Sequence, residues 1–421
     1  MEYGLIGMPL GHSFSKPIHE KLGGYSYDLC PVSREEAEAL LRARCFKGLN
    51  VTIPYKSFVI PYCDEIDQAA QAIGAVNTIV NTGGRLIGHN TDFAGFLYLA
   101  RRMGVSFGGK TVLILGTGGT MKTVAAVARS EGAARVLCAS RQPVPPALSY
   151  GDAAREKGVG ILVNTTPVGM YPNNMDCPLD PALFPRLEAV LDAVYNPLET
   201  CLVQKARALG IPASGGLVML TAQAKAAAEY FLGTSLPERK IAAISREIWQ
   251  ERANLVLVGM PGSGKTSVGR ACARIMNRTF FDVDEEVVRQ AGKPIADIFH
   301  QEGEAAFRTL ETQVIRRLSQ TGGQVISTGG GSILRRENID ALRQNGVLLH
   351  LFRPLEQLQQ GHGRPLSQSR ADIEKLWQTR SSLYTAAAQI RVENAGSLED
   401  AARAACKAFE EAAQPPAISD R

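Results

Sequence analysis

Two glycine-rich segments of the sequence have residue types that can hold the phosphates of a nucleotide. The later one, GMPGSGKT at residues 259–266, follows an apolar strand and precedes a helix. In this pattern backbone N–H groups bind phosphate oxygens, Lys265 reaches the outer phosphates and the Thr266 hydroxyl ligates Mg²⁺. The predicted loop also includes Gly262, Ser263, Gly264 and Ser267. The segment predicts ATP binding but leaves the acceptor open.

The earlier segment, LGTGGT at residues 115–120, matches the dinucleotide pattern less well, because Met121 replaces its third glycine. The next predicted strand ends at Ser140-Arg141, where an NAD enzyme has an acid for the ribose hydroxyls. An arginine without that acid favours a 2′-phosphate, hence NADP(H). The alternative is that Arg141 is an ordinary exposed arginine. The residues assigned to this cofactor are Gly116, Thr117, Gly118, Gly119, Thr120, Ser140, Arg141 and Gly216.

Downstream of the second loop, five motifs follow in order: D-x-D, F-R-x-x-E, T-G-G-G, R-P-L and R-x-x-L-Y. With this order, residues 253–412 resemble shikimate kinase. The resemblance implies that Arg308 and Arg380 bind the substrate carboxylate, and that Asp284 binds the attacking hydroxyl, to orient or deprotonate it. It also implies that Asp282 supports Mg²⁺ and that Gly330 lies against the substrate ring. Each arginine taken alone would be read as a solvated surface charge.

The predicted lid of this kinase, LEQLQQGHGRPL, departs from the family because it lacks a further arginine before R-P-L. Arg364 is therefore the predicted sole lid cation over the phosphates.

Six separated segments in the first 245 residues together resemble shikimate dehydrogenase; they are GLIGMPLGHSFSKPIH, GLNVTIPYK, GAVNTI, GHNTDFAG, NTTPVGM and MLTAQA. Reduction of a ketone leaves an oxyanion that needs a proton donor. The resemblance gives this role to Lys56, with Asp92 as its charge partner and a substrate hydrogen bonder. An isolated lysine would otherwise be read as a surface residue. The other residues that match substrate contacts are Ser13, Ser15, Thr52, Asn77, Tyr195 and Gln223.

Short apolar runs that alternate with helical stretches predict parallel sheets with crossover helices, an α/β fold class. We expect a two-domain shikimate dehydrogenase with a Rossmann-like NADP domain, followed by a P-loop NMP-kinase-like parallel-sheet domain. The expected boundaries are 1–95 with 218–249 for substrate binding, 96–217 for NADP and 253–421 for the kinase. We expect the end of the chain, AAQPPAISDR, to fray.

The chain has 421 residues, 45% of them hydrophobic, and a net charge of +5. Its basic residues are interspersed with acidic ones. These values favour a multidomain enzyme of the cytoplasm with small-molecule substrates, and they exclude a nucleic-acid stripe. No run has the length of a membrane span, and no obligatory protein partner is evident. The eight cysteines are scattered without a C-x-x-C pair, so we expect them to be reduced.

Together the two resemblances predict a bifunctional enzyme: NADPH reduces 3-dehydroshikimate to shikimate, and ATP with Mg²⁺ phosphorylates its 3-hydroxyl, two steps toward chorismate. One alternative is an NAD-dependent quinate/shikimate dehydrogenase joined to another small-metabolite kinase. A second is a catalytically dead shikimate-sensing scaffold. The presence of Lys56, Asp92, Lys265 and Asp284 argues against the second alternative.

Overall fold

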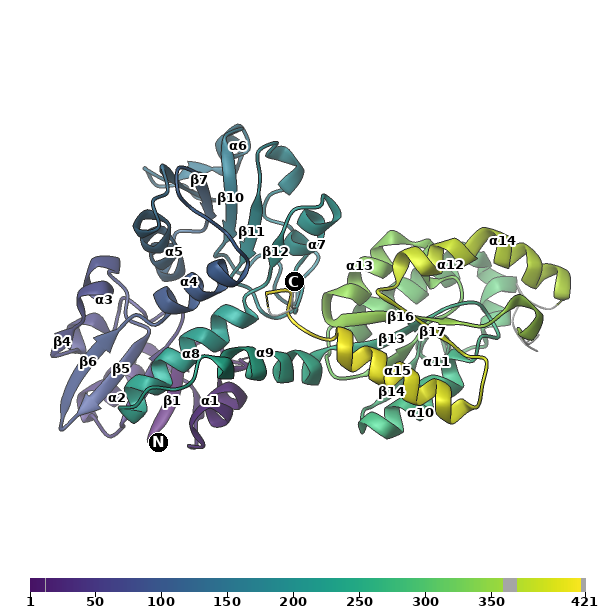
Figure 1. The fold of residues 1–421 in the computed structure, drawn as a ribbon, viewed down its shortest axis with the longest axis horizontal. Helices are drawn as coiled ribbons and strands as arrows, with labels where there is room; N and C mark the ends of the chain where they lie inside the picture. The colour runs from purple at the N-terminus through teal and green to yellow at the C-terminus, as the bar shows by residue number, and fades with distance from the viewer. Residues whose placement is uncertain (12, 359–368, 418–421) are drawn as a thin grey trace. The chain divides into compact units, whose positions relative to one another are not determined.

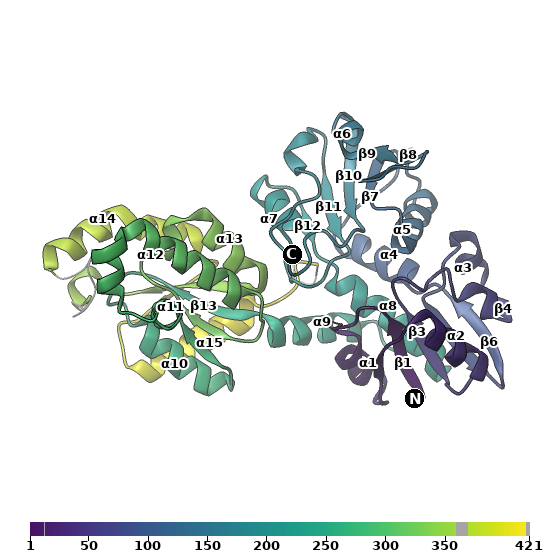
Figure 2. The same ribbon diagram turned by 180° about the vertical axis from the view of Figure 1, so that it is seen from behind.

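A computed structural model describes residues 1–11, 13–358 and 369–417 (Figures 1 and 2). The chain forms two compact units. The first contains Met1–Ile248 together with the described residues 415–417, and the second contains Trp249–Gln414. Within the described ranges, none of the helices is both long and apolar enough to span a membrane.

The first unit begins with a six-stranded mixed sheet of order β2-β1-β3-β5-β6-β4, which we call the mixed-sheet lobe. Strands β1, β2 and β3 are parallel, whereas β5 and β6 form an antiparallel hairpin. Side chains such as Ile6, Leu49 and Ile79 are fully buried beneath its helices. Its elements are β1 (Tyr3–Gly7), α1 (Ser15–Gly23), β2 (Asp28–Pro31), α2 (Arg34–Ala43), β3 (Gly48–Val51), β4 (Glu65–Ile66), α3 (Gln68–Ile73), β5 (Thr78–Thr82) and β6 (Arg85–His89).

A second sheet in this unit has six parallel strands in the order β12-β11-β10-β7-β8-β9, and we call it the parallel-sheet lobe. The chain order reverses between β7 and β10, and ligands of open α/β sheets bind at the carboxyl ends of strands beside such a reversal. Its elements are β7 (Thr111–Leu115), α5 (Gly119–Ser130), β8 (Arg135–Ser140), β9 (Leu148–Ser149), α6 (Tyr150–Ala153), β10 (Val159–Asn164), β11 (Ala189–Asp192), α7 (Cys201–Ala208) and β12 (Ala213–Ser214).

Two packed helices, α4 (Asp92–Arg102) and α8 (Leu217–Leu232), join the two lobes. Gly95 makes their close approach possible, because a Cβ atom at this position would lie 2.7 Å from the Met219 carbonyl oxygen. Helix α8 carries the chain back from the parallel-sheet lobe to the mixed-sheet lobe, and α9 (Arg239–Arg252) follows it.

The described end of the chain is packed into the first unit, so the expectation that it frays is wrong for these residues. Ala417 is 3% exposed and belongs to the cluster that contains Phe96 and Leu99 of α4. The Arg102 Nε donates a hydrogen bond of 3.2 Å to the Ala417 carbonyl oxygen. A small apolar side chain and a satisfied carbonyl thus fix a segment whose composition indicates disorder. The predicted kinase domain, 253–421, accordingly extends past the compact second unit, which ends at Gln414.

The second unit contains five parallel strands in the order β14-β15-β13-β16-β17. Helices α10 and α15 lie on one face of this sheet, and α12 and α13 on the other (Figures 1 and 2). The central strand β13 is fully buried from Leu255 to Val258. The architecture confirms the predicted α/β fold class.

The elements of this unit are β13 (Asn254–Val258), α10 (Lys265–Met276), β14 (Phe280–Asp282), α11 (Val283–Ala291), α12 (Ile295–Ser319), β15 (Val325–Ser327), α13 (Arg336–Asn345), β16 (Gly346–Phe352), α14 (Arg370–Ala387), β17 (Ile390–Glu393) and α15 (Leu398–Ala412). Short 3₁₀ turns occur at Ile60–Tyr62, Pro181–Leu183, Ser332–Leu334 and Leu355–Gln357.

Two candidate active sites

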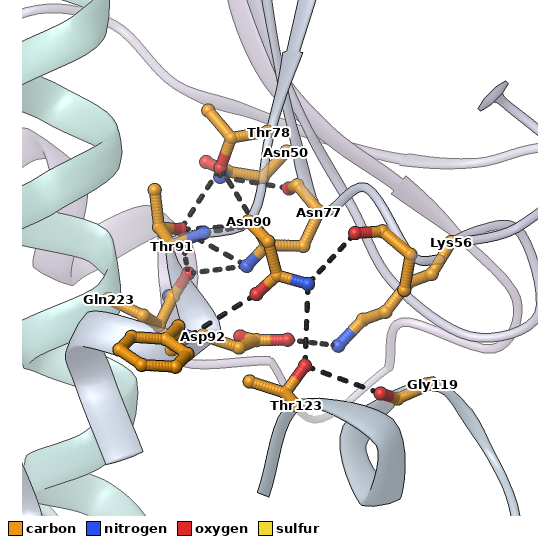
Figure 3. A network of polar contacts seen from close by, with 12 residues as sticks. Asn50, Lys56, Asn77, Thr78, Asn90, Thr91, Asp92, Gly119, Thr123 and Gln223 are labelled. Atoms are coloured by element: carbon orange, nitrogen blue, oxygen red, sulfur yellow. Dashed lines mark hydrogen bonds and ion pairs between the residues drawn. The ribbon is translucent and has the colours of Figure 1, made fainter. Parts of the chain in front are cut away.

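A buried ion pair lies between the two lobes of the first unit (Figure 3). The Lys56 Nζ lies 2.5 Å from Asp92 Oδ2, and the two side chains are only 13% and 9% exposed. Lys56 follows β3, and Asp92 is the first residue of α4, where the helix N-terminus favours a carboxylate. The pair therefore places an ammonium group in a sheltered position, held by a fixed anion.

Amide and hydroxyl side chains form a network beside this pair (Figure 3). The Asn77 Nδ2 donates to Thr91 Oγ1 at 3.1 Å, and its Oδ1 accepts from the Thr91 backbone N–H at 2.7 Å. From α8, the Gln223 Oε1 accepts hydrogen bonds from Asn77 at 3.5 Å and from Thr91 at 3.3 Å. Gln223 thus lies beside Asn77 although 146 residues separate them in the sequence.

A set of hydroxyl groups surrounds the start of α1. The Ser15 backbone N–H donates to Ser13 Oγ at 3.2 Å, and the Ser13 and Tyr195 side chains share a hydrogen bond. The Tyr195 ring centroid lies 5.2 Å from that of Phe14. Burial raises the pKa of Tyr195, so its hydroxyl stays neutral and can donate. Thr52 follows β3, where its backbone N–H donates to the Ile6 carbonyl oxygen and its side chain packs on Gly7 of β1.

The glycine-rich loop after β7 contacts the catalytic candidate Lys56. Gly116 has a φ of +113°, and a Cβ there would lie 2.7 Å from Thr165 Oγ1, so the position requires glycine. Gly118 caps α5, and a Cβ on Gly119 would lie 3.3 Å from Lys56 Cδ. The loop that resembles a dinucleotide cradle therefore packs directly on the stem of the lysine.

The remaining cofactor candidates lie at the end of β8 and at the start of α8. Ser140 ends β8, and Arg141 beside it is exposed with no acid at the strand end. Gly216 precedes α8, where a Cβ would lie 2.3 Å from the Ala193 carbonyl oxygen. That close approach gives Gly216 a packing role that the sequence alone does not indicate.

In the second unit, a loop with three glycines at positive φ connects β13 to α10. The φ angles are 152° at Gly259, 78° at Gly262 and 93° at Gly264. Lys265 begins α10, and its Nζ donates to the carbonyl oxygens of Gly259 at 2.8 Å and Met260 at 2.9 Å. The lysine thus lies against its own loop, within the space that the loop encloses.

Oxygen atoms suited to a hard cation lie next to this loop. The Thr266 Oγ1 donates to Asp282 Oδ2 at 2.7 Å, and Asp282 Oδ1 accepts from the Asp284 backbone N–H at 3.0 Å. A hydroxyl and a carboxylate at one point fit Mg²⁺, which takes few protein ligands and completes its shell with water and phosphate oxygens. Among the described residues, no group of three or more His, Cys, Asp or Glu side chains is arranged to hold a metal ion.

A second glycine loop, after β15, is enclosed by charged side chains. A Cβ on Gly329 would lie 2.7 Å from Asp284 Oδ1 and 2.9 Å from Glu311 Oε1, and one on Gly331 would clash with the Arg308 guanidinium. Gly330 packs on Pro261 of the first loop. Its carbonyl oxygen accepts hydrogen bonds from Arg380 at 3.2 Å and from the Tyr384 hydroxyl.

Arg308 is only 8% exposed. Its guanidinium donates to Glu311 at 2.8 Å and to Glu304 at 3.0 Å. Two carboxylates thus hold this arginine in one orientation beside the loop of Gly330.

Known proteins resemble both units. Residues 5–79 match the family model for the shikimate dehydrogenase substrate binding domain, and residues 261–410 match that for shikimate kinase. The NADP(+) shikimate dehydrogenase of Symbiobacterium thermophilum is 37% identical over 263 residues, which are 56% of this chain and 90% of the relative. That of Moorella thermoacetica is 36% identical over 58% of this chain and 92% of its own length.

The chain belongs to the shikimate dehydrogenase family.

Solved structures agree with this assignment. Shikimate dehydrogenase 1 of Peptoclostridium difficile has a TM-score of 0.55 and 31% identity, over 59% of this chain and 98% of its own. Shikimate dehydrogenase of Thermus thermophilus, solved with NADP(H) and shikimate, has a TM-score of 0.53 and 30% identity, over 59% and 99% of the two chains. These relatives cover the first unit, so we call it the dehydrogenase unit. Residues 261–410 of the second unit match the shikimate kinase family model, and we call this unit the kinase unit.

The structure brings most of the predicted site residues together. In the dehydrogenase unit, Lys56 contacts Asp92, Asn77 contacts Gln223, and Ser13 contacts Tyr195. In the kinase unit the side chains of Asp284 and Arg308 and the backbone of Gly330 meet at one loop, and Arg380 bonds to it. Thr117, Gly118, Arg141 and Ser267 are exposed and make no contact with these groups that identifies a role. Arg364 lies outside the described residues.

The sequence reasoning missed four residues that the structure places in these sites. Thr91 lies between Asn77 and Gln223, and Asn90 connects the neighbouring loop to Thr123 of α5. Glu311 holds Arg308 and accepts a 2.5 Å hydrogen bond from the Ser332 hydroxyl. Asn90 and Thr91 stand in GHNTDFAG and Glu311 in F-R-x-x-E, so both motifs contain the signal, but nothing in the sequence marks Thr123.

Proposed function

We propose that this chain is a bifunctional enzyme that reduces 3-dehydroshikimate to shikimate with NADPH and phosphorylates the 3-hydroxyl of shikimate with ATP. The observation that carries the proposal is that each unit has a nucleotide loop beside its own proton-handling group. In the dehydrogenase unit Gly119 packs on Lys56, and in the kinase unit Pro261 of the phosphate loop packs on Gly330, beside Asp284. Family membership of both units supports the same pair of reactions.

In the reduction, Lys56 protonates the ketone oxygen of the substrate as negative charge develops there. Asp92 holds the Lys56 ammonium in place, with 2.5 Å between Nζ and Oδ2. Asn77 and Gln223 orient the ring hydroxyls, and Ser13, Ser15 and Tyr195 bind the carboxylate. Residues 116–120 would hold NADPH, which would supply the hydride for the carbonyl carbon. Arg141 binds its 2′-phosphate.

In the phosphorylation, Asp284 accepts the proton of the attacking hydroxyl. Arg308 and Arg380 bind the substrate carboxylate, and Glu311 fixes Arg308 so that its guanidinium needs no reorganisation during the reaction. Thr266 and Asp282 would hold Mg²⁺, which neutralises phosphate charge when ATP is bound. Lys265 turns from the carbonyl oxygens of its own loop toward the outer phosphates.

The purified full chain tests the proposal directly. With 3-dehydroshikimate and NADPH, absorbance at the NADPH band must fall, and addition of ATP and Mg²⁺ must convert the shikimate formed into shikimate 3-phosphate. Quinate with NAD, in the reverse direction, tests the first alternative. Turnover of quinate but not of shikimate would show that the dehydrogenase unit acts on quinate instead. Binding of shikimate without turnover in either unit would favour a sensing scaffold.

A further inference from the structure

One side chain, Asn90, connects the two lobes of the dehydrogenase unit (Figure 3). Its Nδ2 donates to the Ala75 carbonyl oxygen at 2.9 Å, in the mixed-sheet lobe. The same nitrogen donates to Thr123 Oγ1 at 3.3 Å, in helix α5 of the parallel-sheet lobe. Asn90 is 7% exposed and Thr123 is fully buried, so water does not replace these contacts without cost.

The mixed-sheet end of this connection holds the segments that carry the ion pair. The Asn90 Oδ1 accepts from the Phe93 backbone N–H at 3.3 Å, in the first turn of the helix that begins at Asp92. Next to Ala75, the Val76 backbone N–H donates to the Lys56 carbonyl oxygen at 2.8 Å. Asn90 therefore contacts the backbone on both sides of the Lys56–Asp92 pair without contacting either side chain.

The parallel-sheet end leads back to the same lysine. The Thr123 hydroxyl donates to the Gly119 carbonyl oxygen at 3.3 Å while it accepts from Asn90. Gly119 belongs to the nucleotide loop and packs on the stem of Lys56, since a Cβ there would lie 3.3 Å from Lys56 Cδ. The contacts thus form a closed circuit that runs from Asn90 through Thr123 and Gly119 to Lys56.

We propose that Asn90 and Thr123 are positioning residues of the reduction: their hydrogen bond sets the distance between the nucleotide loop and Lys56, and so between hydride donor and proton donor. This inference rests on the proposed dehydrogenase function. A connection between two lobes that touches no substrate should govern the hydride step more than the binding of either substrate. Rates of hydride transfer respond to small changes in donor position.

The variant Thr123→Val tests this, because valine keeps the shape of threonine and removes only the hydroxyl. Thr221→Val is the matched control: Thr221 is also fully buried in a helix and donates to a carbonyl four residues earlier, Leu217, at 3.1 Å, but it does not contact Asn90. Thr123→Ser, which restores the hydroxyl, is the rescue variant. Each full-length variant is assayed with NADPH and with NADPH deuterated at the transferred hydrogen, and its phosphorylation of shikimate reports the concentration of intact enzyme.

We expect Thr123→Val to lower kcat for reduction by roughly three- to tenfold, the factor that one neutral hydrogen bond commonly contributes. The isotope effect on kcat should rise, while KM for both substrates stays within about twofold. Thr221→Val and Thr123→Ser should keep the wild-type kcat and isotope effect. In an Asn90→Ala background, Thr123→Val should cause no further loss, because the hydrogen bond is already absent.

Three results would overturn the proposal. An unchanged kcat and isotope effect in Thr123→Val, with an active wild type, would remove the positioning role and leave the proposed function intact. Equal losses in Thr123→Val and Thr221→Val would assign the effect to general packing. A wild-type chain that does not reduce 3-dehydroshikimate would remove both the proposed function and the positioning role that depends on it.

Discussion

At the scale of residues, the two sites share one feature: the charged group that we propose acts on substrate is held by a fixed partner. Lys56 has Asp92, and Arg308 has Glu311 and Glu304. Such a partner lowers the reorganisation needed when charge develops. The motifs predicted the acting groups, because their types are tied to the chemistry. They do not mark Thr123, because a hydroxyl occurs in many buried networks and only the fold brings this one to Asn90.

A prediction at the scale of residues concerns Arg141, which we propose selects NADPH over NADH. One charge-assisted contact between arginine and phosphate contributes about 1.5–3 kcal/mol, so Arg141→Ala should weaken the use of NADPH by roughly ten- to a hundredfold. Reaction with NADH should stay nearly unchanged. Arg155→Ala is the control, since Arg155 is an exposed arginine of the same lobe that pairs with Asp152. Steady-state kcat/KM for both cofactors provides the measurement, and an equal loss with NADH would rule out a 2′-phosphate contact.

At the scale of elements, the sequence predicted the alternating strands and helices of both units. Local periodicity and glycine-rich loops determine those elements, and therefore the sequence alone predicts them. The sequence could not predict the burial of Ala417, because this burial depends on a cluster to which helices α4, α5, α8 and α9 and strands of the parallel sheet contribute. The packing of Gly95 against α8 likewise needs the tertiary structure.

Gly95 gives a prediction for the helix pair α4 and α8. Alanine in a helix is ordinarily about 1 kcal/mol more stable than glycine. At Gly95, however, a Cβ would meet the Met219 carbonyl oxygen at 2.7 Å and Gln223 Cβ at 2.8 Å. We therefore expect Gly95→Ala to lower the melting temperature and to raise KM for 3-dehydroshikimate, because Gln223 must move.

Gly151→Ala is the control for this experiment, because Gly151 lies in helix α6 with its nearest contact at 3.7 Å. Thermal unfolding followed by circular dichroism, with kinetics on the same samples, makes the comparison. A Gly95→Ala variant as stable and as active as Gly151→Ala would show that the two helices can separate without loss.

At the scale of the whole molecule, the dehydrogenase unit is discontinuous in sequence, because residues after Gln414 belong to it. A cut of the gene near Ala253 would separate the two segments that resemble the dehydrogenase and the kinase. In the structure Ala417 packs in the core of the dehydrogenase unit, so such a cut would leave a core residue of that unit on the kinase piece. Cytoplasmic location and independence from a protein partner stay predictions.

Removal of residues 415–421 should therefore destabilise the dehydrogenase unit, although these residues follow the kinase in the sequence. We expect the truncated chain to lose stability in the dehydrogenase unit while kcat for phosphorylation stays within about twofold, since burial of each apolar methyl-sized group contributes about 1 kcal/mol. The point variant Ala417→Gln should act in the same direction. Ala412→Gln, at an exposed position near the end of α15, is its control. Thermal inactivation of each activity measures the effect, and equal inactivation rates for truncated and full-length dehydrogenase would contradict it.

The central claim is that two complete and chemically separate active sites lie on one chain. The most direct measurement follows 3-dehydroshikimate, shikimate and shikimate 3-phosphate by chromatography in one reaction with NADPH, ATP and Mg²⁺, using the wild type, Lys56→Ala and Lys265→Ala. General-acid catalysis contributes roughly 10²–10⁴-fold, so Lys56→Ala should form almost no shikimate and yet phosphorylate added shikimate at the wild-type rate. Lys265→Ala should accumulate shikimate. Loss of both reactions in either variant, with the fold retained by circular dichroism, would contradict two separate sites.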